Sequence, residues 1–498
     1  MTTELLHRIA ELEKQVEQLE SRNQFLEEQF RIAQHKQFGK STEGHPGQGE
    51  LFNEVEELYV EIEAPEQETI SYTRNKPKRK PLPTDLPREV VVHDISDEEK
   101  VCDCCAGELH RIGEDKSEKL QFIPAQVKVI EHVRPKYACR TCEKKGTRNT
   151  IKQAAMPCSV IPKGYATESL LSQIITSKYQ YGLPLYRQEA MFKQHGIELS
   201  RKTMADWIIR CAELFKPLYD QLHQHLLQQS VIAADETTLK VIDSDKANSY
   251  MWLYACGADS PAGKIAGSDI PNIVLYDNHN IRAGQCAVDF LKGYNGYLQV
   301  DGYVGYEQTQ AMLVGCWAHA RRKFMDAKKG AGKKGSGKAD WALNHIQKLY
   351  RIETQLKDKT AEERYNLRQE KSVPLLSQFH TWLMKSAHQV LPKTKLGEAI
   401  QYCLNQWQKL ERYKLDGLLN IDNNRAERAI KPFVIGRKNW LFSQTASGAN
   451  ASAVLYSIIE TAKANDLNVF EYVMKCLEQL CQSKTDIEQL LPWQFAKR

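Results

Sequence analysis

Two aspartates of the sequence stand at the ends of apolar runs that have the composition of β-strands. Asp235 ends the run VIAAD, and Asp301 ends the run YLQVD, before Gly302. Side chains at the ends of neighbouring strands can converge above a sheet, and two carboxylates held together need cations. Mg²⁺ prefers oxygen ligands and keeps several of its waters. We therefore expect Asp235 and Asp301 to share a metal site, with the side chain of Glu236 on the opposite face of its strand.

A third carboxylate is expected from a helix. A period of 3.6 residues divides the segment 422–431 into an apolar face, with Ala426, Ala429 and Ile430, and a polar face, with Asn424, Glu427, Arg428 and Lys431. The polar face offers one acid, Glu427, among basic side chains that can hold phosphates, and Glu353 and Glu460 are the alternative third acids. A single acid is usually a surface or capping residue, so only the combination of three favours chemistry.

Four cysteines in two CxxC pairs have the spacing of a metal site. They are Cys102 and Cys105, followed by Cys139 and Cys142. Each pair lets two thiolates reach one ion from a tight turn, and two pairs complete a tetrahedral Zn²⁺ site with a structural role. The spacer holds a strand-like run at 122–133, as a zinc ribbon would. Cys104 is an alternative ligand in the first pair, and buried free thiols are the alternative to zinc.

The N-terminal 38 residues predict a coiled coil. Seam positions of four heptads are occupied by Leu5, Ile9, Leu12, Val16, Leu19, Asn23, Leu26 and Phe30. One Asn at an a position typically fixes a two-stranded register, so the segment predicts a homodimer. A helix packed on its own chain is the alternative. The acidic and then basic linker at 39–98 cannot bury enough surface to fold, although its basic half could contact phosphates.

Residues 159–229 predict a helix-turn-helix. A helix over 185–192 is followed by Gly196, and Ser200 is expected to cap a second helix. That helix leaves three basic side chains for solvent or DNA, namely Arg201, Lys202 and Arg210. Many helical hairpins share this pattern without touching nucleic acid.

From residue 230 the period becomes that of strands. Apolar runs of strand length lie at 231–242, 249–257 and 272–277. A helical pattern follows at 281–294, and two further apolar runs lie at 296–303 and 312–316. This order predicts a mixed α/β sheet. Helical patterns then fill 316–415, around a basic Gly-rich loop at 328–338, and return at 422–431 and 452–485. The loop matches a phosphate-binding pattern, but Ala339 stands where Ser or Thr must hold Mg²⁺, so we exclude ATP binding.

The composition is that of a large globular protein. The 498 residues include 68 Lys and Arg and 63 Asp and Glu, a net charge of +5, and 42% of the residues are hydrophobic. No apolar run spans a bilayer, and the N-terminus is charged where a signal peptide is apolar. We therefore expect a cytoplasmic protein of several domains, with no membrane partner and no disulfide framework.

Four ordered segments resemble the transposases of bacterial insertion sequences, in the insertion-sequence-66 family. They read AADETTLKV, YLQVDGYVGY, GCWAHARRKF and DNNRAERAIKPFVIGRKNWLFS. The resemblance implies a DDE transposase in which Asp235, Asp301 and Glu427 hold two Mg²⁺ (or Mn²⁺) ions, cut DNA at the terminal inverted repeats and transfer the strand to a target. Cys316 and His319 resemble a CxxH signature of several DDE groups, either as metal ligands or as packing or DNA-positioning residues.

The same resemblance implies an order of parts along the chain. The expected parts are a coiled coil (1–38), a linker (39–98), a zinc-binding module (99–158), a helix-turn-helix (159–229), an RNase H-like core in two pieces (230–328 and 419–450), a helical insertion (329–418) and a C-terminal helical region (451–498). The expected partners are DNA (element ends and target), a second copy of the chain, and accessory proteins of the same element.

Basic and aromatic residues surround the third acid. The expected DNA contacts there are Arg425, Arg428, Lys431, Arg437 and Lys438. Trp440 and Phe442 could stack a base or be buried in the core. Two rival functions remain, a non-enzymatic DNA-binding regulator and a nuclease or resolvase without strand transfer. The first predicts a missing acid, and the second has no need for the coiled coil, zinc module and insertion together.

Overall fold

A computed structural model of the chain describes residues 126–138, 151–246, 248–331, 337–482 and 484–496, with Glu89, Val90, Cys104 and scattered residues between Arg8 and Phe30. The chain divides by its internal contacts into two compact units, residues 64–154 and residues 1–63 with 155–498. No helix within the described ranges is both long enough and apolar enough to span a membrane. The expected linker at 39–98 lies outside the described residues apart from Glu89 and Val90.

A five-stranded sheet of order β5-β4-β3-β6-β7 lies at the centre of the larger unit. Its strands are β3 (Val231–Leu239), β4 (Ser249–Cys256), β5 (Ile273–His279), β6 (Tyr297–Gln299) and β7 (Met312–Val314). The first three form an antiparallel meander, whereas β6 pairs in parallel with β3, and β7 in parallel with β6. The predicted mixed sheet is confirmed.

Both edges of the sheet are covered by helices. Hydroxyl groups of α15 (Ala446–Ala464) replace a neighbouring strand along β5, since Ser457 Oγ accepts from Tyr276 N at 2.8 Å and Thr461 Oγ1 accepts from Val274 N at 3.0 Å. At the other edge, Arg412 donates to the carbonyl of Leu313 in β7 at 2.8 Å. Covered edges cannot pair with the sheets of other molecules.

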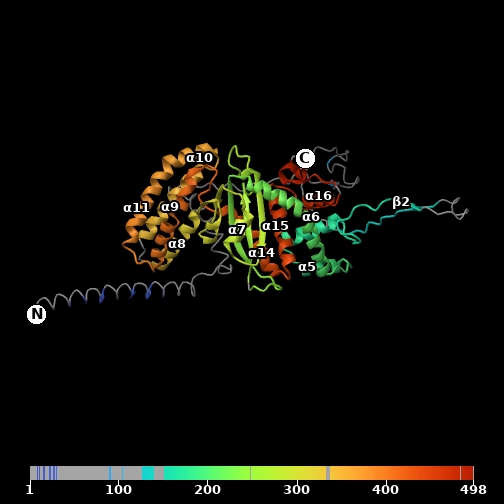
Figure 1. Ribbon diagram of the computed structural model, residues 1–498, viewed down its shortest axis with the longest axis horizontal. Coiled ribbons are helices and arrows are strands. Elements are labelled where there is room, and N and C mark those ends of the chain that lie inside the picture. The colour runs from blue at the N-terminus through green and yellow to red at the C-terminus, as the bar shows by residue number, and fades with distance from the viewer. Residues whose placement is uncertain are drawn as a thin grey trace. The chain divides into compact units, whose positions relative to one another are not determined.

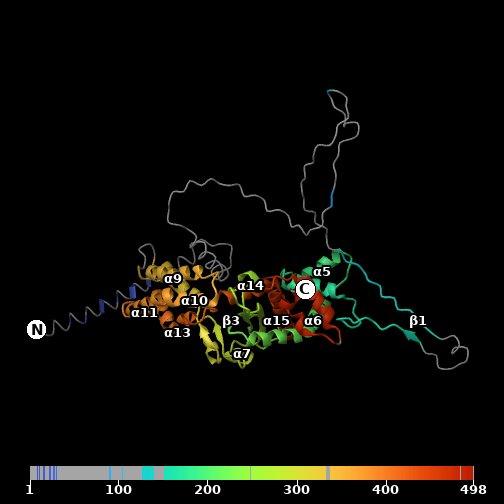
Figure 2. The same ribbon diagram turned by 90° about the horizontal axis from the view of Figure 1, so that it is seen from above.

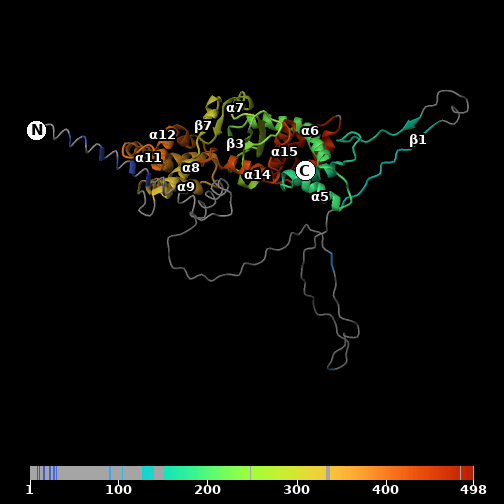
Figure 3. The ribbon, with the colours of Figure 1, turned by 90° about the horizontal axis from the view of Figure 1, so that it is seen from below.

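Two helices cover opposite faces of the sheet near β3. Figures 2 and 3, seen from above and from below, show α7 (Gly284–Phe290) on one side of β3 and α14 (Asn424–Trp440) on the other. The ring of Phe290 in α7 stacks on Tyr254 of β4 with centroids 3.9 Å apart. Because both faces are covered, the central strands are apolar on both sides, and the neighbours Leu253 and Tyr254, which point to opposite faces of β4, are both fully buried.

A helical subdomain interrupts the chain between β7 and α14. It comprises α8 (Trp317–Ala331), α9 (Gly337–Gln355), α10 (Ala361–Leu367), η5 (Arg368–Ser372), α11 (Val373–Ala387), α12 (Lys395–Asn405), α13 (Trp407–Glu411) and η6 (Arg412–Leu415). Trp317 and Phe324 of α8 share its hydrophobic core with Phe379 and Leu383. Figure 1 shows α8, α9, α10 and α11 on one side of the sheet and α6 and α15 on the other.

The basic loop expected at 328–338 is shorter in the structure. Helix α8 continues through Ala331 and α9 begins at Gly337, and residues 332–336 lie outside the described residues. The predicted bounds were wrong at both ends. At the first end, Lys328 and Lys329 are good helix formers and extend α8 by a turn.

The predicted helix pair at 185–211 is present, but its second helix is much longer than expected. Helices α4 (Glu168–Tyr179), α5 (Leu185–Gln194) and α6 (Arg201–Leu227) follow one another. Gly196 adopts a positive φ of 75° in the turn, and the side chain of Ser200 caps α6 by accepting from Thr203 N at 3.1 Å. Helix α6 continues past Pro217 and packs on α15 and β5, and α16 (Val469–Leu480) adjoins them.

A few residues of the N-terminal segment are also described. Val16, Leu19, Leu26 and Phe30 are helical and each is more than half exposed. A stripe of exposed apolar side chains at seam positions favours pairing with a second chain over packing on its own chain.

A short antiparallel pair of strands lies in the described part of the smaller unit. Strands β1 (Lys136–Tyr137) and β2 (Lys152–Gln153) pair there, and the side chain of Gln153 donates to the carbonyl of Arg134 at 3.0 Å. The strand expected at 122–133 is absent from its described part, residues 126–133. Val127 and Val129 are exposed there, so the β-branched pattern has no partner surface to cover.

Candidate active site

The parallel pairing of β3 and β6 brings the two aspartates to equivalent positions. Ala233 of β3 pairs with Gln299 of β6, and Asp235 and Asp301 each stand two residues further along. Because side chains on a strand alternate between the two faces of the sheet, Asp235 and Asp301 point to the same face as Ala233 and Gln299. One oxygen of each is fixed by a backbone amide, Asp235 by Glu236 N and Asp301 by Tyr303 N, both at 2.8 Å.

The third acid is brought to this point by the start of α14. Glu427 lies in the first turn of α14, which packs on β3 and β4 through a buried side that includes Ala426 and Phe433. Asn423, just before the helix, donates its side-chain amide to the carbonyl of Ala234 at 2.8 Å. Ala234 immediately precedes Asp235. This hydrogen bond therefore ties the helix that carries Glu427 to the strand that carries Asp235.

The pKa shifts of Asp235 and Glu427 indicate that the three carboxyl groups lie near one another. Burial raises the pKa of Asp235 well above its usual value, and the charges of Glu236, Asp301 and Glu427 raise it further. Burial also raises the pKa of Glu427 to about 7, against the lowering effect of Arg322 and with further raising by Asp422 and Asp301. Mutual repulsion of this kind is what a divalent cation relieves.

Glu427 also lacks, among the described residues, the hydrogen bonds that a buried carboxylate needs. It is 3% exposed, and neither of its carboxylate oxygens has a hydrogen-bond partner among the described residues. Burying a carboxylate without partners is costly, so buried acids are normally paired or coordinate a metal. Asp235, Asp301 and Glu427 therefore have the ligand chemistry of a site for divalent cations. Among the described residues, however, the ligand atoms that lie within 4.8 Å of one another are those of Cys316, His319 and Glu427, and not those of the three acids.

Glu236 has a different environment from Asp235. Its carboxylate pairs with Arg282, with Nε at 3.0 Å from Oε1, and accepts a hydrogen bond from the hydroxyl of Tyr306 at 2.6 Å. Tyr306 belongs to η3 (Val304–Gln308), which packs against α7. The expected opposite orientation of the two neighbours agrees with these contacts. Glu236 is nevertheless a buried, paired acid and not an inert position.

The alternative third acids are held elsewhere. Glu460 pairs with Lys463, with both carboxylate oxygens within 2.9 Å of Nζ, and Glu353 pairs with Arg368 at 2.7 Å. The charges of Asp235 and Asp301 are not among the causes that shift the pKa of Glu460. Of the three candidates, Glu427 is therefore the one that the structure brings to the aspartates.

Cys316 and His319 lie beside the third acid. Cys316 follows β7 and is 1% exposed, and its sulfur accepts a hydrogen bond from Asn423 N at 3.2 Å. His319 is in the first turn of α8, and its Nδ1 is 3.6 Å from Oε1 of Glu427. Burial, followed by the neighbouring charge of Arg322, lowers the pKa of His319 to about 4. A neutral imidazole keeps a lone pair for a metal or a phosphate-bound proton.

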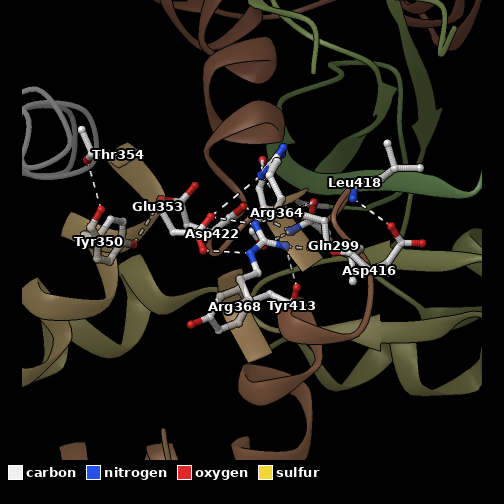
Figure 4. A network of polar contacts seen from close by, with 12 residues as sticks. Gln299, Tyr350, Glu353, Thr354, Arg364, Arg368, Tyr413, Asp416, Leu418 and Asp422 are labelled. Carbon is white, nitrogen blue, oxygen red and sulfur yellow. Dashed lines mark hydrogen bonds and ion pairs between the residues drawn. The ribbon is translucent and has the colours of Figure 1, made fainter. Parts of the chain in front are cut away.

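A buried polar network holds the segment that leads into α14 (Figure 4). The Arg368 side chain, fully buried, donates to the carbonyls of Tyr413, Asp416 and Leu419 at 2.8 to 2.9 Å. From the sheet, Gln299 of β6 donates to the carbonyl of Asn420 at 2.7 Å. The segment before Glu427 is thus fixed both by the helical subdomain and by the strand that ends at Asp301. No local sequence pattern indicates Arg368, Gln299 or Asn423, because their partners, mostly backbone groups, are distant in sequence.

The basic residues expected to contact DNA differ in their exposure to solvent. Arg201, Lys202, Arg428 and Lys438 are exposed, and Lys431 and Arg437 are partly buried. Arg425 is buried and, like Arg428, donates to the carboxylate of Asp259, at 2.9 and 2.6 Å respectively. Arg210 pairs with Glu213 at 2.9 Å. Asp259 is a partner that the sequence did not indicate.

The two aromatic residues after the third acid have different environments. Trp440 packs on Phe433 with ring centroids 5.6 Å apart, as a core residue does, whereas Phe442 is 44% exposed. Leu441 between them has a positive φ of 64°, which is uncommon for a residue with a side chain, and ends α14.

The expected zinc ligands cannot be placed. Cys102, Cys105, Cys139 and Cys142 lie outside the described residues, and the alternative ligand Cys104 is exposed. Strands β1 and β2 lie on either side of the second CxxC pair in the sequence.

Family models match most of the chain. A model described as Transposase IS66 family matches residues 163–451, and one described as zinc-finger binding domain of transposase IS66 matches residues 99–143. Residues 25–91 match a model described as Transposase C of IS166 homeodomain, and residues 457–493 match the IS66 C-terminal element. The transposase model thus includes all three acids, and the zinc-finger model includes both CxxC pairs.

Curated relatives resemble the chain over most of its length. Uncharacterized protein y4hP of Sinorhizobium fredii (strain NBRC 101917 / NGR234) is 35% identical over 447 residues, which are 86% of this chain and 78% of that protein. Uncharacterized protein y4jD of the same organism is 36% identical over 428 residues, 83% of this chain and 81% of that protein. No solved structure matches the chain.

Proposed function

The chain belongs to the IS66 family of transposases, and we propose that it is a DDE transposase that cuts and joins DNA with Asp235, Asp301 and Glu427. The observation that carries the proposal is the position of Glu427, a buried carboxylate without hydrogen-bond partners among the described residues, on a helix tied to the strand of Asp235. A buried carboxylate without hydrogen bonds lowers the stability of the fold, and binding a cation removes this cost. The non-enzymatic rival predicts a missing acid, and none of the three is missing.

The acids would hold two Mg²⁺ or Mn²⁺ ions. When bound, such ions activate water for strand cleavage and then the freed 3′-hydroxyl for strand transfer. The chain itself holds the three acids in fixed positions. The aspartates lie at two paired strands, and Glu427 lies on a helix that Asn423 ties to β3. No side chain needs to act as a covalent nucleophile, so the acids serve as ligands.

The sheet supports an RNase H-like core for this domain. Three antiparallel strands are followed by two parallel ones, the first aspartate lies on β3 and the second follows β6, and the helical subdomain enters after β7. The proposed parts along the chain are those given by the sequence, from the coiled coil at 1–38 to the C-terminal region at 451–498.

DNA binding is proposed for the basic residues that solvent can reach. Arg201 and Lys202 stand exposed at the start of α6, and Arg428 and Lys438 on α14. Contacts from these side chains to phosphates would supply most of the affinity, and the ends of the element, its terminal inverted repeats, would be recognised through the helix pair α5 and α6.

The N-terminal parts would organise the complex. Cys102, Cys105, Cys139 and Cys142 are the proposed ligands of one structural Zn²⁺. The exposed seam residues, such as Leu19 and Leu26, support a parallel dimer that would hold two element ends together. Accessory proteins of the same element are a further proposed partner.

The proposal is tested with the purified full chain and labelled duplex DNA that carries the terminal inverted repeats of its own element. We expect strand cleavage at the repeat and joining to a target plasmid with Mg²⁺, and neither with EDTA or with a scrambled repeat. Cleavage without joining would favour the nuclease, and specific binding without cleavage would favour the regulator.

A further inference from the structure

A second set of ligand atoms meets at Glu427. Cys316, His319 and Glu427 offer a sulfur, a ring nitrogen and a carboxylate oxygen that all lie within 4.8 Å of one another. The separation of 3.6 Å between His319 Nδ1 and Glu427 Oε1 is long for a hydrogen bond. It suits two ligands of one ion, because ligand atoms around a tetrahedral Zn²⁺ are about 3.4 Å apart.

Two of the three ligand groups, the imidazole and the carboxylate, have no hydrogen-bond partner among the described residues. His319 Nδ1 and both carboxylate oxygens of Glu427 are buried without a hydrogen bond among the described residues. Buried polar atoms are normally hydrogen-bonded, so three unpaired atoms in one place indicate a ligand that binds there. The side chain of His319 is 26% exposed, which gives an ion a path from solvent to the buried sulfur.

We infer that Cys316, His319 and Glu427 form a binding site for a thiophilic divalent cation of the zinc class, which shares Glu427 with the two aspartates. The class follows from the ligands, since sulfur and imidazole select Zn²⁺ and its neighbours, whereas Mg²⁺ takes oxygen. Three protein ligands leave a fourth position for water. Binding replaces the thiol proton of Cys316, which passes to solvent, and the Asn423 amide already donates to this sulfur as supporting groups do in thiolate sites.

One consequence rests on the proposed function. A carboxylate that ligates Zn²⁺ beside Cys316 and His319 is less available to the ions held by Asp235 and Asp301. Zn²⁺ therefore acts as an inhibitor of Mg²⁺-dependent cleavage. The ratio of cleavage rates with and without Zn²⁺ should fall well below one in the wild type and return to one in Cys316→Ser, whatever the basal rate of that variant.

The site itself is tested by zinc stoichiometry, which does not depend on activity. The full chain is stripped with a chelator, dialysed against Zn²⁺ under reducing conditions and analysed for metal. We expect Cys316→Ser and His319→Gln each to bind one zinc ion fewer per chain than the wild type. His319→Gln is the second variant because its partly exposed ring can be replaced without opening a cavity in the core.

Two controls separate this site from its neighbours. Cys211→Ser changes an equally buried cysteine of α6 and should keep the wild-type stoichiometry. Asp235→Asn should also keep it, because Asp235 is not a ligand of the proposed ion. Retention of the full zinc count by Cys316→Ser or by His319→Gln overturns the site. Loss in Asp235→Asn also overturns it, because the ion would then belong to the three acids.

Discussion

The guanidinium group of Arg368 makes two hydrogen bonds to the carboxylate of Glu353, at 2.9 and 2.7 Å, in the interior of the helical subdomain. The same guanidinium holds three carbonyls of the segment 413–419. That segment continues into the helix of Glu427. The helical subdomain thus has a structural connection to the third acid, as well as a core of its own.

Replacing Arg368 by Met should destabilise the protein by about 3–5 kcal/mol, because it removes both close hydrogen bonds of the buried Glu353 carboxylate and the side-chain donor of the Tyr413 carbonyl. Arg364 stays 3.8 Å from Glu353 and still donates to the carbonyl of Leu419. Thermal unfolding of the purified chain measures this. Arg351→Met, at an exposed position of the same helical subdomain, should change stability by no more than about 0.5 kcal/mol. Equal melting temperatures for Arg368→Met and the wild type would show that the network does not hold the segment.

The pairing of Asp259 with Arg425 and Arg428 predicts an effect on DNA affinity. Asp259→Asn removes a negative charge beside two basic side chains, so binding to duplex DNA should tighten and the dependence on salt should steepen. Arg428→Ala should weaken binding and reduce the salt slope by about 1. Fluorescence anisotropy over a range of NaCl concentrations measures both, with Asp358→Asn, an exposed acid of the helical subdomain, as the control. Unchanged slopes in both variants would place this surface outside the DNA interface.

His345 predicts a loss of stability in acid. Its Nε2 donates to the carbonyl of Leu375 at 2.8 Å, and burial lowers its pKa, with the charge of Lys348 acting in the same direction. In the unfolded chain His345 has its ordinary pKa of about 6.5, so below this pH it binds a proton more readily than in the folded chain. The stability that the neutral ring contributes above this pH is therefore lost as the pH falls.

Melting temperatures at pH 7.5 and pH 5 measure the effect. His345→Gln keeps a donor for Leu375 without a titrating group, so its melting temperature should fall less than that of the wild type between these two pH values. His388→Gln, at an exposed histidine, should follow the wild type. The assignment is wrong if His345→Gln and His388→Gln behave alike.

The N-terminal seam predicts the oligomeric state. Replacing Leu12 and Leu19 by Asp puts charges into the apolar seam and should convert the dimer into a monomer. Light scattering of the full chain measures the mass directly. A wild-type chain that is monomeric at micromolar concentration would refute the coiled coil, and a dimeric double variant would move the interface elsewhere.

The strands and their two aspartates could be read from the sequence because local pattern determines them. β-branched runs of the right length mark β3, β4 and β5, and Asp235 and Asp301 stand in or just after such runs. The 3.6-residue period likewise located the first turn of α14 and its acid.

What the sequence could not indicate depends on contacts between distant segments. The amide of Asn423 meets Ala234 across 189 positions, and Arg428 meets Asp259 across 169. Helix α6 also continues past Pro217, where a helix is usually interrupted, and its apolar side chains there, such as Leu218 and Leu222, are buried in the core that it shares with α15. The burial of Glu427 could not be foreseen, since the polar face of its helix predicts exposure.

The proposed chemistry requires three acids, from β3, the end of β6 and α14, to act together on the phosphodiester bond. Cleavage of element-end DNA with Mg²⁺ by Asp235→Ala, Asp301→Ala and Glu427→Ala tests this, with DNA binding measured in parallel. Glu307→Ala is the control, because Glu307 is an exposed acid six residues after Asp301 whose pairing with Lys409 lies outside the site. Glu236→Ala is unsuitable as a control, since it would leave Arg282 and Tyr306 without their partner.

Each of the three variants should lose at least about two orders of magnitude in cleavage rate while binding end DNA as tightly as the wild type, because phosphate contacts from Lys and Arg supply the affinity. Glu307→Ala should cleave normally. Cleavage at the wild-type rate by Glu427→Ala would assign the third ligand to another acid, and cleavage at that rate by Asp235→Ala would contradict the mechanism.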